Sequence, residues 1–142
     1  MKLVDANVLL YATNAEGPQH APCRAWLEAA LNASEPIGFA WVVLLAFLRL
    51  STKAQVFEAP LTPQRAMERM RAWLASPVAT VVVPGDRHLT LLEGLLVAVG
   101  TGGNLTSDAH LAALALEHGA SIVSCDADFA RFSGVAHFNP LR

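Results

Sequence analysis

Charged side chains are scarce in this sequence: only 15% of its 142 residues are Asp, Glu, Lys or Arg, and the net charge is −2 at pH 7. This balance excludes the broad basic surface that binds nucleic acid through many phosphate contacts. Any attraction to nucleic acid must therefore come from a local patch or from a bound metal ion. Hydrophobic residues make up 54% of the chain, a surplus that favours a partner covering part of the surface.

Long hydrophobic runs are also missing. The longest, from Phe39 to Leu48, has ten residues, whereas a membrane span needs about 18–20. The first acidic residue, Asp5, comes too early for a secretory signal peptide, so we expect a cytoplasmic protein without a membrane segment. Cys23 and Cys125 stand apart without metal-ligand spacing, and we predict two reduced, mostly buried thiols.

Strand-like and helix-like patterns alternate along the chain. Short apolar or β-branched runs predict strands at 2–5, 37–39, 79–83, 121–125 and 135–138. Helical periodicity and helix-ending residues predict helices at 18–33, 41–50, 63–76, 86–99 and 106–118, and a helical turn at 127–132. For 41–50 the periodicity alone does not exclude a strand. The length predicts a single domain, residues 1–142. The alternation predicts an α/β fold, a three-layer α/β/α sandwich with a mostly parallel central sheet.

Several helix ends carry clear chemical signals. Thr62 precedes Pro63, a pair typical of a helix start, because the threonine caps and proline needs no amide partner there. We expect Thr106 or Ser107 to cap the helix that runs to residue 118. Glycines at 100 and 119 are expected to end the last two long helices.

Two aspartates from opposite ends of the chain, Asp5 and Asp126, each follow a strand-like run. If both strands lie parallel in one sheet, both carboxylates emerge at the same edge, where open α/β sheets bind ligands. Asp108, in the first turn of a predicted helix, is the natural third member, and Asp128 is a second contributor beside Asp126. Carboxylate oxygens gathered in this way suit Mg²⁺ or Mn²⁺.

Each acid also has an ordinary explanation that the sequence leaves open. Asp5 and Asp126 could cap the helical segments that follow them. Asp108 could be placed by the helix dipole, which favours an acid in the first turn by ~0.3–1 kcal/mol. An aspartyl phosphatase or a receiver-like pocket is a weaker alternative. The first would need Asp-x-Asp where Asp5-Ala6-Asn7 stands, and the second would need a mid-chain phosphoacceptor and a late lysine.

Other chemistry-bearing residues form no catalytic pattern. The histidines lack metal-ligand spacing, and we interpret His110 as structural or solvent-facing. The glycine-rich segment 100–104 follows a helix rather than a strand, so we interpret it as a connection and not as a phosphate-binding loop. Ser107 has no evident base partner, which argues against a serine hydrolase.

Three segments, in this order, resemble the PIN domain and, more narrowly, the VapC toxins of bacterial VapBC toxin–antitoxin pairs. They are Val4 to Ala12, Leu105 to Ala115 and Ser124 to Phe129. The similarity covers nearly the whole chain. It implies a Mg²⁺- or Mn²⁺-dependent endoribonuclease that cuts RNA, often tRNA or rRNA. It also implies inhibition by a VapB-like antitoxin and a homodimeric state.

Carried over to this chain, the resemblance implies three catalytic residues that also bind the metal: Asp5, Asp108 and Asp126. Asp128 is an additional candidate ligand. The polar side chains of Asn7 and Ser124 are expected to support the site.

One expected member of the acidic set is missing. The family usually has a glutamate in a pattern like Glu-Phe-Leu-Arg, whereas this chain has Ala46-Phe47-Leu48-Arg49, and no acid lies within 41–48. This departure leaves two interpretations. The chain is a ribonuclease with weakened metal affinity, or it is a catalytically weak PIN domain that binds RNA or antitoxin.

The apolar helices at 18–33 and 41–50 are candidates for a dimer face or an antitoxin groove. An ordinary role in the core is the alternative for either helix.

Overall fold

Five parallel strands form one sheet in the computed structural model, which describes all residues from 1 to 142. The strands are β1 Lys2–Val4, β2 Ile37–Ala40, β3 Ala79–Val82, β4 Ser121–Val123 and β5 His137–Phe138. Their order across the sheet is β3-β2-β1-β4-β5, and every neighbouring pair is parallel. The predicted strands are therefore confirmed. The central position of β1 places its carboxyl end between those of β2 and β4.

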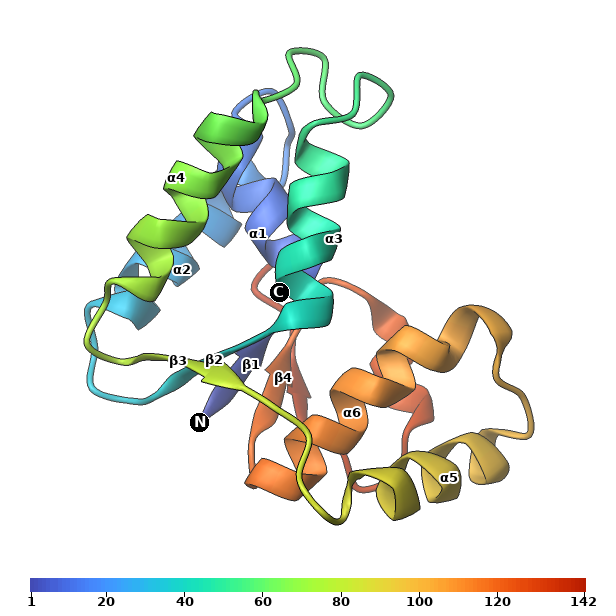
Figure 1. Cartoon of the computed structure of the whole chain (residues 1–142). Coiled ribbons are helices and arrows are strands. Elements are labelled where there is room, and N and C mark those ends of the chain that lie inside the picture. The colour runs from blue at the N-terminus through green and yellow to red at the C-terminus, as the bar shows by residue number, and fades with distance from the viewer.

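Helices cover both faces of this sheet, as the alternation of elements predicts. Figure 1 shows α1 to α4 gathered on one side and α5 with α6 on the other. The helices are α1 Ala6–Thr13, α2 His20–Leu31, α3 Trp41–Ser51, α4 Pro63–Leu74, α5 His88–Val99 and α6 Thr106–His118. Two 3₁₀ segments, η1 Gly103–Leu105 and η2 Ala127–Arg131, complete the chain. The α/β/α prediction is confirmed, and residues 41–50 form a helix rather than a strand.

The core explains why the strands lack a polar alternation. Side chains such as Leu3, Phe39 and Ile122 are completely or almost completely buried, because helices cover both faces of a parallel sheet. On the α1–α4 side, Trp73 stacks on Phe39 with ring centroids 6.4 Å apart and meets Phe47 edge-on at 4.8 Å. This aromatic cluster fixes α3 and α4 against the sheet.

Two local expectations about helices need correction. The periodicity of the sequence predicts no helix at residues 6–13, where α1 lies. Only the capping alternative for Asp5 requires a helical segment there. At the start of α6, neither Thr106 nor Ser107 is the cap: the preceding residue is Leu105, which makes no side-chain capping bond. The reason is that η1 leads directly into α6 with nearly helical dihedral angles, so no separate cap is formed.

The other helix signals are confirmed. The hydroxyl of Thr62 accepts a hydrogen bond from the Arg65 amide, and Pro63 is the first residue of α4. Gly100 and Gly119 end α5 and α6 with positive φ angles of 84° and 64°, a conformation that glycine adopts without strain. No helix in the structure is both long and apolar enough to cross a bilayer.

Candidate functional site

Asp5 lies where β1 ends and α1 begins, and its carboxylate is held in one orientation. One oxygen accepts a hydrogen bond from the Ala6 amide at 2.8 Å. The other accepts hydrogen bonds from the Ser124 hydroxyl at 2.7 Å and from the Asn7 side-chain amide at 3.2 Å. Asp5 is therefore the N-cap of α1 and also a fixed acid at the sheet edge. A capping role for Asp5 is therefore compatible with a role as a candidate metal ligand.

Ser124 connects the two loops that carry the acids. Its side chain is fully buried. It donates to Asp5 and accepts hydrogen bonds from the Asp126 amide at 3.0 Å and from Asn7 at 3.2 Å. The side-chain carbonyl of Asn7 accepts a further hydrogen bond from the Cys125 amide at 3.0 Å. These bonds join segments that are more than a hundred residues apart in sequence.

Three further aspartates converge beside this arrangement. One carboxylate oxygen each from Asp108, Asp126 and Asp128 lies within 4.8 Å of the others. Asp126 follows β4 after a two-residue interval, and its carboxylate accepts the Asp128 amide at 2.9 Å, which shapes η2. Asp5 lies outside this tightest group, because its oxygens are turned toward Ser124, Asn7 and Ala6.

Electrostatics show that these carboxylates repel one another. Burial, together with the charges of Asp5, Asp126 and Asp128, raises the pKa of Asp108 to about 6, and burial is the largest of these causes. Burial also raises the pKa of Asp5, an effect that the hydrogen bond from Ser124 opposes. No lysine, arginine or histidine forms an ion pair with any of the four.

This donor set fits a hard divalent cation. Mg²⁺ and Mn²⁺ prefer carboxylate oxygens, and oxygens that share one Mg²⁺ at about 2.1 Å lie roughly 3–4 Å apart. The oxygens of Asp108, Asp126 and Asp128 all lie within 4.8 Å of one another, so small side-chain movements would bring them to this spacing. A cation there would also relieve the repulsion that raises the pKa of Asp108.

An open cavity of about 390 Å³ lies between α3 and α6 next to Asp5 and Asp108. Helix α3 contributes five lining residues, and four of them lie on one helical face, three or four positions apart. The five are Val42, Val43, Leu45, Ala46 and Arg49. Ala46 therefore lines the same cavity as two of the acids. The glutamate that the resemblance implies at this position would face the cavity, and this chain has the methyl group of Ala46 there.

Sequence reasoning missed two features of this region. Arg49 is the one basic residue that lines the cavity, and its place there depends on how α3 packs. Cys23 and Cys125 are free thiols whose sulfur atoms lie 3.6 Å apart, although 101 residues separate them in sequence. Burial raises the pKa of Cys125 to about 12, so both thiols stay protonated at neutral pH. No sequence signal predicts this contact.

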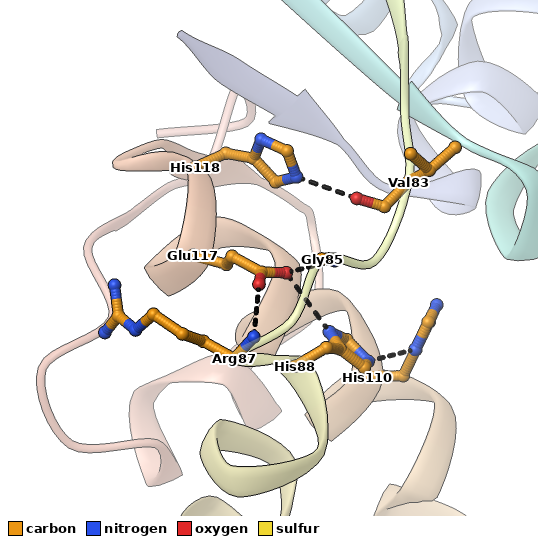
Figure 2. Close-up of polar contacts among 7 residues, drawn as sticks. All are labelled: Val83, Gly85, Arg87, His88, His110, Glu117 and His118. Atoms are coloured by element: carbon orange, nitrogen blue, oxygen red, sulfur yellow. Dashed lines mark hydrogen bonds and ion pairs between the residues drawn. The ribbon is translucent and has the colours of Figure 1, made fainter.

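Three of the five histidines, His88, His110 and His118, belong to a different region, the joint between α5 and α6 (Figure 2). His88 and His110 share a hydrogen bond of 2.9 Å, which gives His110 the structural role expected of it. Glu117 accepts hydrogen bonds from the Gly85 and Arg87 amides at 2.7 and 3.0 Å, and it lies 3.9 Å from His88. The bond from Gly85 is the main reason that the pKa of Glu117 is lowered.

A parallel sheet with aspartates at the carboxyl ends of β1 and β4 is the arrangement expected of a PIN domain. The family model described as "PIN domain" matches residues 2–135, and the chain belongs to this family. Its relatives place it in the VapC branch. The chain is 54% identical over 140 residues to Ribonuclease VapC37 of Mycobacterium tuberculosis, covering 99% of this chain and 97% of that protein. It is 41% identical over 142 residues to Ribonuclease VapC33 of the same species, covering 100% and 99%.

Solved structures share the fold at much lower identity. VapBC2 from Rickettsia felis, bound to a DNA fragment from its promoter, superposes with a TM-score of 0.73. The sequence identity is 15%, and the match covers 97% of each chain. At this identity the likeness supports the fold alone.

Proposed function

We propose that this protein is a ribonuclease toxin of a type II toxin–antitoxin pair that hydrolyses RNA phosphodiester bonds at the aspartate-lined edge of the sheet. The names of the relatives support the reaction class. The observation that carries the proposal in this chain is the meeting of Asp108, Asp126 and Asp128 beside Asp5, with no basic partner.

The proposed metal ligands are Asp108, Asp126 and Asp5, with Asp128 contributing directly or through water. A bound Mg²⁺ or Mn²⁺ would supply a Lewis acid that activates water and stabilises charge on the phosphate. In the reaction, water would add to the phosphorus atom and the bond to the leaving nucleotide oxygen would break, and a proton lost by the water would end, through solvent, on that leaving oxygen. Ser124 and Asn7 hold the Asp5 carboxylate in place throughout.

Ala46 sets the expected strength of this site. It offers no carboxylate where the family usually has one, so a water molecule must fill that position. We therefore expect weaker metal affinity and a need for raised Mg²⁺ or Mn²⁺. The second candidate function, a catalytically weak PIN domain that binds RNA or an antitoxin, rests on this same residue.

We further propose that residues 1–142 act as one PIN-like unit in the cytoplasm, with a VapB-like antitoxin as inhibitor and a second copy of the chain as dimer partner. Solved relatives include a complex described as VapBC2. Exposed apolar side chains on α5, such as Leu89 at 76% and Val97 at 73%, are suited to such partners.

The test compares RNA cleavage by the wild type, Asp5→Asn and Ala46→Glu over a range of Mn²⁺ concentrations. The proposal expects Mn²⁺-dependent cleavage that Asp5→Asn removes and that Ala46→Glu supports at lower Mn²⁺. If Asp5→Asn cuts as well as the wild type, the proposed site is wrong. If only Ala46→Glu cuts, the weak-domain alternative holds.

A further inference from the structure

An exposed stripe follows one side of α3 from the sheet edge outward. Trp41 is 52% exposed, Leu45 is 57% exposed and Arg49 is also exposed. The three residues are spaced by four, so they follow one another along the helix surface. Leu45 and Arg49 line the cavity that also contains Asp5 and Asp108. Leu45 and Arg49 therefore lie on the rim of this cavity, and Trp41 extends the same side of α3 by one helical turn toward the sheet edge.

The guanidinium of Arg49 is free for a ligand. None of the ion pairs in the chain includes it, and no hydrogen bond holds its side chain. The nearest helical position toward the cavity is Ala46, which has no charge to pair with it. A planar guanidinium beside a site for phosphodiester chemistry can bind phosphate oxygens through two parallel hydrogen bonds.

Trp41 offers a different contact at the other end of the stripe. It is the first residue of α3, directly after β2, so it lies at the same carboxyl edge of the sheet as Asp5. The other two tryptophans are much less accessible: Trp73 is 9% exposed, and Trp26 is partly buried. An exposed indole ring stacks on any nucleic-acid base, because every base has a π-face.

Resting on the proposed function, we propose that the stripe Trp41, Leu45 and Arg49 is the RNA-binding rim of the site. Arg49 holds a phosphate of the bound strand, and Trp41 stacks on one of its bases. The eight helical steps from Trp41 to Arg49 span about 12 Å along the helix, enough to contact more than one nucleotide. RNA is favoured as the occupant because Arg49 is the one basic residue that lines the cavity and has no ion pair, so a phosphate held there avoids the carboxylates of Asp5 and Asp108.

The experiment measures binding of a fluorescein-labelled single-stranded RNA octamer by anisotropy between about 50 and 300 mM salt. EDTA is present, so cleavage does not interfere. Arg49→Gln should weaken binding about five- to tenfold at low salt, and the slope of log affinity against log salt should become shallower by about 0.7. Arg49→Lys should recover most of the slope, because the phosphate needs the charge. Arg71→Gln on α4, outside the cavity, is the matched control and should bind like the wild type.

The stacking contact has a separate signature. Trp41→Leu should weaken binding about fivefold or more without changing the salt slope, whereas Trp41→Phe should retain most of the affinity. RNA should also quench the tryptophan fluorescence of the wild type more than that of Trp41→Phe.

The inference is wrong if Arg49→Gln and Trp41→Leu bind RNA with wild-type affinity and salt slope. If the same variants instead lose affinity only for the purified cognate antitoxin, the rim is a protein-docking surface. These outcomes are separate from a failure of the proposed function, because they concern metal-free binding. The nuclease proposal is tested by Asp5→Asn in the cleavage assay.

Discussion

The carboxyl edge of the sheet and the α5–α6 joint both contain partly buried acids, and they treat them in opposite ways. At the joint, Glu117 is surrounded by donors, and its pKa is lowered. At the edge, Asp108 is surrounded by other carboxylates, and burial together with their charge raises its pKa to about 6. At the joint, backbone amides of the protein itself stabilise the Glu117 carboxylate. At the sheet edge, no basic side chain balances the aspartates, so their charge is left for a bound cation.

This difference separates structural acids from candidate functional ones. A buried polar group that only stabilises a fold normally has its partners in place. Groups with a raised pKa and like-charged neighbours in a cleft are more typical of binding or catalytic sites. On this criterion the sheet edge is the stronger candidate site. At the joint Glu117 has its partners, and the one buried polar atom without a hydrogen bond is Nδ1 of His88, 3.9 Å from Glu117.

The largest expected effect comes from removing a carboxylate at the edge. Asp108→Asn keeps the shape of the side chain and removes one charged ligand, so RNA cleavage should fall at least about a hundredfold at saturating Mn²⁺. Thermal unfolding of the metal-free protein should show a stability equal to or higher than that of the wild type, because repulsion is relieved. A loss of stability would mean that Asp108 has a structural role instead.

A smaller loss is expected when the support of the site is removed. Ser124→Ala leaves the Asp5 carboxylate and the Asp126 amide each without one hydrogen bond. Cleavage should fall about 10- to 100-fold, and half-maximal activity should need more Mn²⁺. Ser133→Ala, at an exposed serine away from the site, is the control. Equal Mn²⁺ requirements in both variants would show that Ser124 does not position Asp5.

At the α5–α6 joint the expected effect is on stability and not on cleavage. Glu117→Gln keeps one acceptor oxygen but places a donor amide against the Gly85 or Arg87 amide, so one backbone N–H loses its partner. The melting temperature should decrease, while the specific cleavage rate of the folded protein at 25 °C should stay near that of the wild type. A large loss of cleavage with no change in melting would overturn the distinction between the two regions.

The smallest expected effect is a pH dependence of stability in metal-free buffer. The folded pKa of Asp108, about 6, lies above its ordinary value of 3.8, so the folded protein binds this proton more tightly than the unfolded chain does. The contribution is fully present below about pH 4 and is lost as the pH rises through 6. Unfolding measured between pH 4 and 7 should show this decline, and Asp108→Asn should flatten it.

Much of this molecule could be predicted because its signals are local. The strand runs, the Thr62-Pro63 helix start and the terminal glycines depend on residues a few positions apart, and the structure confirms them. The meeting of Asp5 and Asp126 at one sheet edge followed from a general rule about parallel strands. The lining of one cavity by Ala46 and Asp5 agrees with the position indicated by the resemblance.

The rest depends on contacts that sequence spacing does not encode. Hydrogen bonds between Glu117 and the Gly85 turn, and the contact between Cys23 and Cys125, require the packed structure. The same is true of which acids form the tightest cluster. Asp128, and not Asp5, joins Asp108 and Asp126 there. Which face of α3 borders the cavity, and hence the place of Arg49, also follows from packing.

The most direct test of the central claim is thermal unfolding at pH 7 with increasing Mn²⁺, compared among the wild type, Asp108→Asn and Glu117→Gln. Binding to the folded state alone stabilises by about 2.7 kcal/mol when the ion is at a hundred times its Kd. The wild type and Glu117→Gln should therefore both gain stability with Mn²⁺, and Asp108→Asn should gain little. An equal gain in all three proteins, or none in the wild type, would contradict the assignment of the aspartate edge as a cation site.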